Sequence, residues 1–219
     1  MEKYYNEYWA QTWYRNSFLV RCPKQIAQAI GHDHEWNNLY DSGCHFTCLS
    51  MIIGVDPARL SSTMASMPYF VADRAIPARF LNGRTGGLVW DQNEPHYRIK
   101  EVVLDNFWHS KLGRRVNIKI RFLGIIETAE YSKGKQLIKT ARKKGQHIIC
   151  GTQEHSYLVA GNNEGDFFIW DPDDSEIPIE EILNGKLTLC DLFDKHKGEK
   201  IEFWKYQVDY FPAVSFRRG

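Results

Sequence analysis

Three short apolar runs that follow one another late in the chain constrain its fold most strongly. They cover residues 147–151, 156–161 and 167–170, and each has the length and composition of a β-strand. Residues 162–165, with the sequence NNEG, separate the last two runs and favour a tight hairpin turn. These runs predict an antiparallel sheet in the C-terminal part of the chain.

More strands and a helix are predicted around these runs. Residues 116–126 alternate apolar and polar side chains at their start, and residues 200–216 alternate along much of their length, as half-buried strands do. Residues 133–144 form a basic stretch with helical character that ends at Gly145. Charged runs of this kind are usually solvated helix faces, so we assign no function to this one.

The earlier part of the chain is patterned as helices instead. Residues 44–54 have apolar or small side chains at helical spacing and end at Gly54, a residue typical of helix C-terminal caps. Asp41 or Ser42 is predicted to cap the start of this helix, which leaves Cys44 in its first turn.

Three other segments have helical patterns. Aromatic residues recur four apart within residues 4–14, and residues 56–65 and 100–112 have the spacing of short amphipathic helices. Residues 31–43 and 82–97 are rich in turn formers and are predicted as loops. Helices early and strands late are the pattern of an α+β protein.

The composition allows one large folded unit. With 219 residues, of which 43% are apolar and 14% aromatic, the chain can bury a sizeable core. We expect a single domain over residues 1–219, with a helical half at about 1–112 and a β-rich half at about 113–219. Because 28 basic and 27 acidic residues nearly cancel, the chain lacks the one-signed field of a general nucleic-acid binder.

The sequence favours a soluble cytoplasmic protein. Its first twenty residues scatter charges among aromatics and lack the pattern of a secretory signal, and no apolar run approaches the length of a membrane span. Its five cysteines are an odd number and are unevenly spaced, which argues against a disulfide framework. We therefore expect reduced thiols and no attachment to a membrane.

Cys44 is the candidate nucleophile. A thiol attacks as thiolate, and its pKa falls when it lies at a helix N-terminus beside an imidazole. Gly43 lets the backbone come close to a substrate, and the amide of Cys44 itself can hold an oxyanion. Cys48, one turn further into the helix, is interpreted as a structural thiol.

His155 and Asp171 are the candidate base and its orienting group. The hairpin turn lies midway between them, which puts them on neighbouring strands. With an even register they share one face, either directly opposed or diagonal; an odd register would separate them. A carboxylate bonded to one imidazole nitrogen fixes the tautomer and leaves the other nitrogen for the thiol. Pro172 presents the carboxylate at a strand end.

Other histidines are weaker candidates. Residues 32–35, with the sequence HDHE, offer possible metal ligands but have no later partner at metal-ligand spacing. His45 adjoins Cys44, but neighbouring residues of a helix point in different directions, so it is a poor base for the thiol. We therefore predict no metal site among these residues.

Three blocks of this sequence resemble the C39-like branch of the papain-like cysteine peptidases. The first is DSGC at residues 41–44 with GVDPARL at 54–60, the second is residues 145–161 around His155, and the third is FFIWDP at 167–172 with IPIEEI at 177–182. The resemblance implies a papain-like fold, in which the cysteine helix packs on an antiparallel sheet that carries the histidine and the aspartate.

The resemblance also implies a function that requires neither a metal nor an organic cofactor. It predicts a Cys44–His155–Asp171 triad and a thioester acyl-enzyme formed from a peptide or protein substrate, in a thiol protease or amidase. Asn38 stands where the family usually has the glutamine of the oxyanion hole, and His45 replaces a glycine that usually follows the cysteine.

Two alternatives stay open at the level of sequence. A non-enzymatic binding protein could keep the papain-like fold, and an acyltransferase or transglutaminase could use the same triad.

Overall fold

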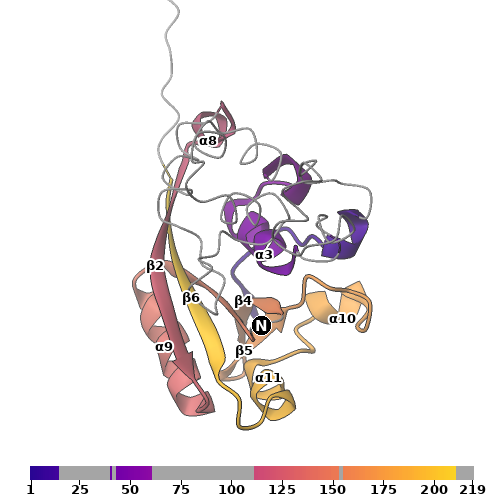
Figure 1. The fold of residues 1–219 in the computed structure, drawn as a ribbon, viewed down its shortest axis with the longest axis vertical. Coiled ribbons are helices and arrows are strands. Elements are labelled where there is room, and N and C mark those ends of the chain that lie inside the picture. Colours follow the sequence, from indigo (N-terminus) through magenta and orange to yellow (C-terminus); the bar gives the residue numbers. More distant parts are fainter. Residues whose placement is uncertain (15–39, 41–42, 61–110, 153–154, 211–219) are drawn as a thin grey trace, which may run out of the picture.

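The computed structural model describes residues 1–14, 40, 43–60, 111–152 and 155–210. These residues form a mixed α+β structure around a six-stranded sheet, in agreement with the predicted α+β class (Figure 1). Its strands are β1 (Glu2–Lys3), β2 (Ile118–Thr128), β3 (Gln146–Gly151), β4 (Ser156–Asn163), β5 (Asp166–Trp170) and β6 (Ile201–Tyr210). The helical elements are η1 (Gln11–Tyr14), α3 (Cys44–Ile53), α8 (Lys111–Val116), α9 (Tyr131–Lys143), α10 (Ile179–Leu183) and α11 (Leu189–Lys195).

All strand pairings of the described sheet are antiparallel. The order is β1-β4-β3-β6-β2, and β5 also pairs with β4. The longest ladder joins β2 to β6 and contains one irregularity, between Phe122 and Gly124. The predicted strands at residues 116–126, 147–151, 156–161 and 167–170 are therefore present to within a few residues.

The hairpin between β4 and β5 has a two-residue turn, Glu164–Gly165. Both residues have positive φ, 46° and 93°, as a turn matched to the twist of the two strands requires. A second irregularity lies between Val159 and Gly161 and shifts the register by one residue along the rest of the ladder. This hairpin and its bulge set which residues of β4 and β5 face each other.

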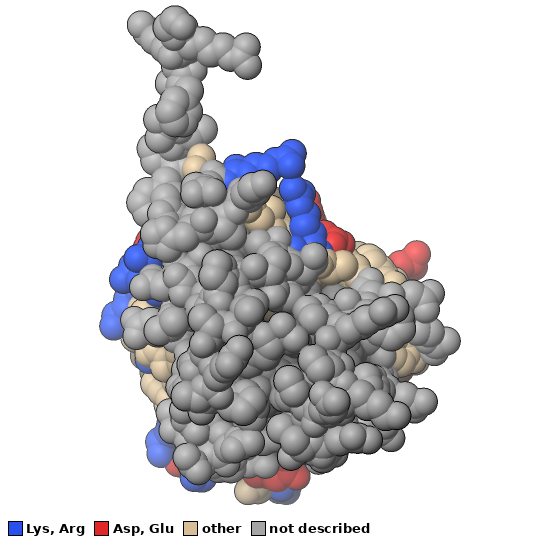
Figure 2. Space-filling model, turned by 45° about the horizontal axis from the view of Figure 1, so that its top comes forward, with Lys and Arg blue, Asp and Glu red and all other residues tan. Residues whose placement is uncertain are grey.

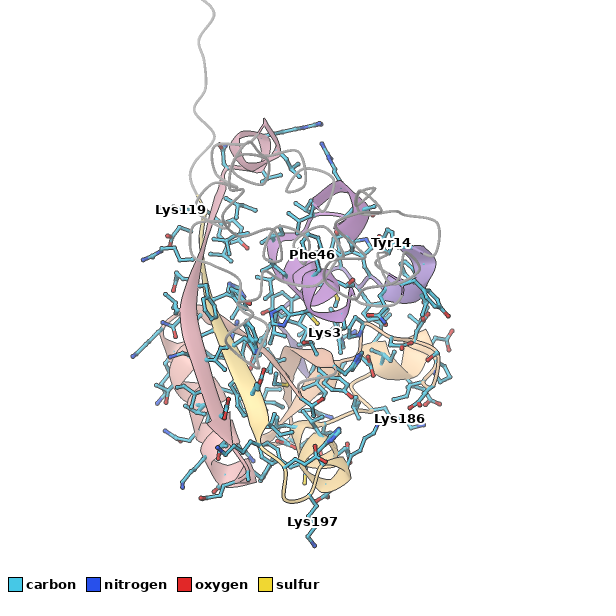
Figure 3. All side chains as sticks on the ribbon, viewed as in Figure 1. Lys3, Tyr14, Phe46, Lys119, Lys186 and Lys197 are labelled. Atoms are coloured by element: carbon cyan, nitrogen blue, oxygen red, sulfur yellow. The ribbon has the colours of Figure 1, made fainter. Side chains whose placement is uncertain are left out.

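Both faces of the sheet are covered. Successive side chains of a strand point to opposite faces, so each strand contributes residues to both. Leu158 and Ala160 of β4 lie in the core beside α3, whereas Tyr157 and Val159 lie in the core beside α9 and α11. Figure 3 shows Phe46 of α3 inside the molecule, while Lys119, Lys186 and Lys197 lie at its periphery. The structure thus has three layers, with α3 on one side of the sheet and α9 and α11 on the other.

The N-terminal segment differs from its prediction. Residues 4–14 are not one helix; within them only η1 is helical. Tyr4 instead donates its N–H to the carbonyl of Ala160 on β4, and the hydroxyl of Tyr5 bonds His147 on β3. Contacts to the sheet therefore replace the local hydrogen bonds that a helix would have made.

Several other sequence predictions have mixed outcomes. Pro57 begins a described helical stretch that runs to Leu60, and the rest of the predicted 56–65 helix lies outside the described residues. The predicted loops at 31–43 and 82–97 lie outside them almost entirely, as does the 100–112 helix. Helix α11 was missed, although Thr188 and Asp191 form a capping box that marks its start.

Charges of both signs are spread over the described surface. In the view of Figure 2, described basic side chains lie at the top, the left and the bottom edge, and acidic ones lie at the right and beside the basic ones at the bottom. The ion pairs are mostly exposed, as between Arg121 and Asp209 at 3.0 Å, and such pairs contribute little to stability. Neither sign dominates the part of the surface that the structure describes.

Candidate active site

Cys44 is the first residue of α3, which packs on β4. The N-cap residue is Gly43, with no side-chain cap; the predicted caps Asp41 and Ser42 lie outside the described residues. The N–H groups at a helix start carry partial positive charge, which favours a negative sulfur in the first turn. As a residue, Cys44 is partly exposed.

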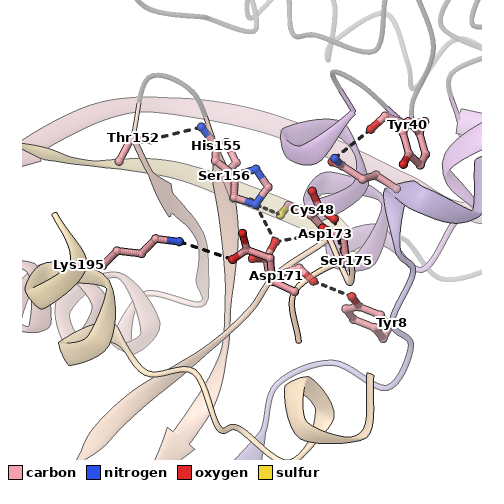
Figure 4. A network of polar contacts seen from close by, with 12 residues as sticks. Tyr8, Tyr40, Cys48, Thr152, His155, Ser156, Asp171, Asp173, Ser175 and Lys195 are labelled. Atoms are coloured by element: carbon pink, nitrogen blue, oxygen red, sulfur yellow. Dashed lines mark hydrogen bonds and ion pairs between the residues drawn. The ribbon is translucent and has the colours of Figure 1, made fainter. Parts of the chain in front are cut away.

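His155 and Asp171 are hydrogen-bonded at the ends of their strands. His155 directly precedes β4 and Asp171 directly follows β5, and His155 Nε2 lies 2.6 Å from Asp171 Oδ1 (Figure 4). The same oxygen accepts the N–H of Asp173 at 2.8 Å, which holds the carboxylate in place. The ring of Tyr157 meets that of His155 edge-on, with centroids 4.6 Å apart.

The register explains why these two side chains meet. Leu158 pairs with Trp170, so the next pair of the ladder would join Tyr157 to Asp171. His155 lies two residues before Tyr157 and is therefore diagonal to Asp171, on the same face. The prediction that an even register brings the two residues together is thereby confirmed in its diagonal form.

The contact between Cys44 and His155 is the second interaction of the candidate site. Burial raises the pKa of the Cys44 thiol, but a hydrogen bond to His155 and the charge of that ring outweigh it, and the pKa falls below its ordinary value. Backbone hydrogen bonds at Ser156 and His45 act in the same direction. Burial alone would lower the pKa of His155, but its hydrogen bonds to Asp171 and Cys44 raise it to about 10. These shifts favour a thiolate beside an imidazolium, with Nδ1 as the ring nitrogen left for the thiol.

The other described thiols lack this environment. Burial raises the pKa of Cys48 well above its ordinary value and that of Cys150 to about 12. Cys190 is exposed, but reduced solvation and the carboxylates around it, Asp194 first among them, raise its pKa as well. The interpretation of Cys48 as a structural thiol fits its complete burial. Cys44 therefore differs chemically from its three described counterparts.

Sequence reasoning missed the contribution of the N-terminal segment. The hydroxyl of Tyr8 donates to the carbonyl of Asp171 at 2.6 Å, and the N–H of Gln11 donates to the carbonyl of Pro172 at 2.7 Å. The side-chain amide of Gln11 also donates to the carbonyl of Tyr40 at 3.0 Å, close to the start of α3. The segment thus ties the aspartate to the cysteine side of the site, a role that no local pattern of residues 4–14 indicates.

His45 has both ring nitrogens occupied. Its Nδ1 lies 3.1 Å from Ser156 Oγ and its Nε2 lies 2.7 Å from the hydroxyl of Tyr206. The expectation that His45 is a poor base for Cys44 agrees with this geometry. Ser156 and Tyr206 were not singled out from the sequence, since each becomes significant only through its contact with α3.

Two predicted groups of residues cannot be placed. Asn38, the second member of the predicted oxyanion hole, lies outside the described residues, as do residues 32–35 of the alternative metal site. Among the described residues, no group of three His, Cys, Asp or Glu side chains is arranged to hold a metal ion. The backbone amide of Cys44 remains the one predicted oxyanion donor within the described chain.

Gly151 is expected to be essential for the placement of His155. A Cβ on Gly151 would overlap the carbonyl oxygen of His155 and lie 2.9 Å from Ser156 Cα. Gly151→Ala should destabilise the fold by about 1–3 kcal/mol in urea unfolding and slow alkylation of Cys44 by iodoacetamide. Gly124→Ala is the control, because its φ of 110° strains an alanine but its Cβ meets nothing within 4 Å. Equal alkylation rates in the two variants would contradict this expectation.

Comparison of the chain with protein-family models, curated proteins and solved structures yields no match. Within the described residues, no helix combines the length and the apolar character needed to cross a membrane.

Proposed function

We propose that this protein is a cysteine-dependent hydrolase of the papain-like, C39-like kind, which acts on a peptide or another amide. The observation that carries the proposal is the chain of contacts from the Cys44 thiol to His155 and on to the Asp171 carboxylate. Each residue fits one role: Cys44 is the nucleophile, His155 the acid and base, and Asp171 the group that orients the ring and stabilises its charge.

The reaction proceeds in two stages. In acylation, the Cys44 thiolate attacks the carbonyl carbon, the carbon–nitrogen bond breaks, and the imidazolium of His155 gives its proton to the leaving amine. In deacylation, neutral His155 takes a proton from water while the oxygen of that water attacks the thioester. The carboxylic acid leaves, and the thiolate–imidazolium pair is restored. The backbone amide of Cys44, with Asn38 as its proposed partner, stabilises the oxyanion of both stages.

The activated ester p-nitrophenyl acetate tests this proposal without knowledge of the natural substrate. We expect release of p-nitrophenol beyond one equivalent, with a transient acetyl group on the Cys44 peptide by mass spectrometry. Acetylation of another residue, or undiminished turnover in a Cys44→Ala variant, would overturn the hydrolase proposal. A library of peptide amides then defines the substrate, and added amines reveal acyl transfer if they intercept the thioester.

A further inference from the structure

A polar cluster with two buried members, next to the nucleophile, has no part in the proposed chemical steps. It consists of His45, Ser156 and Tyr206, from α3, β4 and β6. His45 is only 6% exposed and Tyr206 is fully buried. The ring of His45 also packs edge-on against that of Trp204, with centroids 4.6 Å apart. Such a cluster is stable only if its polar atoms find partners.

The cluster is satisfied when His45 is neutral. Burial lowers the pKa of His45 to about 3, so the ring has one N–H donor and one acceptor nitrogen. The hydroxyls of Ser156 and Tyr206 can each donate or accept, so both ring nitrogens are bonded in either tautomer. His45 therefore makes a fixed, uncharged connection between the cysteine helix and the sheet.

Ser156 connects to α3 at three points. Its Oγ bonds His45, its carbonyl accepts a hydrogen bond from Cys48 Sγ at 3.8 Å, and its backbone bonds Cys44. Figure 4 shows Ser156 between His155 and Cys48. The side-chain bond of Ser156 thus joins the residue after the nucleophile to the residue after the base.

We propose that the His45–Ser156–Tyr206 hydrogen bonds act as a clamp that sets the distance between Cys44 and His155, which makes His45 and Ser156 positioning residues. The inference rests on the proposed function and deepens it. A glycine at position 45 could form neither bond, so the histidine that departs from the family pattern has a defined task in this chain. The clamp works through geometry, because the charged groups of the described chain that act on Cys44 and His155 are those two residues and Asp171.

The test is the pH dependence of iodoacetamide alkylation at Cys44 in full-length variants. Ser156→Ala removes the hydroxyl but keeps the backbone contacts to Cys44 and Cys48. We expect its alkylation rate at about pH 6 to fall by at least about tenfold, with the rate profile shifted to higher pH by about one unit. Ser156→Thr, which restores a hydroxyl, should recover most of the lost rate.

A second variant supplies a matched control for stability. Tyr206→Phe removes the other bond of the clamp, whereas Tyr5→Phe removes a hydroxyl that bonds His147, a half-buried histidine of β3 whose pKa is also lowered. Both should lower the thermal midpoint similarly, but only Tyr206→Phe should slow alkylation of Cys44. Wild-type rates in both Ser156→Ala and Tyr206→Phe would overturn the clamp. A wild-type Cys44 that reacts like an ordinary thiol would instead overturn the proposed function.

Discussion

Cys44→Ser is expected to lower turnover of p-nitrophenyl acetate by a factor on the order of 10⁴ while the protein stays folded. The hydroxyl of serine has a far higher pKa than a thiol, so it does not form the anion that His155 stabilises beside the start of α3. The exchange of sulfur for oxygen changes little volume at a partly exposed position. Initial rates, with the thermal midpoint as a check on folding, measure the effect.

Cys190→Ser is the matched control for this change. Cys190 is an exposed thiol on α11 whose pKa is raised rather than lowered. Its replacement should leave turnover within about twofold of the wild type, because surface substitutions rarely perturb a distant site. If Cys44→Ser keeps more than about a tenth of the activity, a different residue performs the attack.

The second large effect is expected at Asp171. Asp171→Ala removes the group that orients His155 and should lower kcat by about 10² to 10⁴. Asp171→Asn keeps an oxygen that can accept the Nε2–H but removes the charge, so its loss should be smaller. Hydrogen bonds to Asp171 and Cys44 together raise the pKa of His155 to about 10, so neutralising the carboxylate should lower that pKa and move the alkaline limit of activity to lower pH.

Asp173→Asn tests whether this effect belongs to Asp171 alone. Asp173 lies two residues away, and its carboxylate accepts the N–H of Ser175 at 3.0 Å. The variant keeps the backbone N–H that Asp173 gives to Asp171. It should therefore leave both kcat and the alkaline limit close to those of the wild type. A pH profile that shifts equally in Asp171→Asn and Asp173→Asn would assign the effect to general surface charge.

Much of the sheet was predictable because its signals are local. Short apolar runs mark β3, β4 and β5 in the sequence, alternation marks β2 and β6, and NNEG at 162–165 marks the hairpin. The turn itself proved to be Glu164–Gly165, and the bulge near Ala160 adds a further shift. Neither detail could be read from residue types, yet together they decide that His155 and Asp171 are diagonal neighbours.

The N-terminal segment shows where sequence reasoning fails. The spacing of Tyr5, Trp9 and Trp13 has helical period, but Tyr4 and Tyr5 find partners on β4 and β3 instead. These partners lie more than a hundred residues away in the chain. Long-range hydrogen bonds of this kind override a local helical preference, and no window of the sequence contains both partners.

The reactive residues of the candidate site could be predicted, but the residues that hold them in place could not. Cys44, His155 and Asp171 could be selected because a helix start and a hairpin give them a context. The residues that hold them, among them Tyr8, Gln11 and Ser156, are ordinary polar residues of the sequence. Their function appears only when the strands and α3 are assembled.

The most direct test of a thiolate–imidazolium pair at Cys44 is the relative rate at which iodoacetamide alkylates each cysteine, read peptide by peptide by mass spectrometry. At about pH 6 an ordinary thiol is below about 1% thiolate. We predict that Cys44 reacts at least about tenfold faster than Cys190 at this pH, although Cys190 is the more exposed thiol. Preferential alkylation of Cys190, or a Cys44 rate that rises only near the ordinary thiol pKa, would contradict the account.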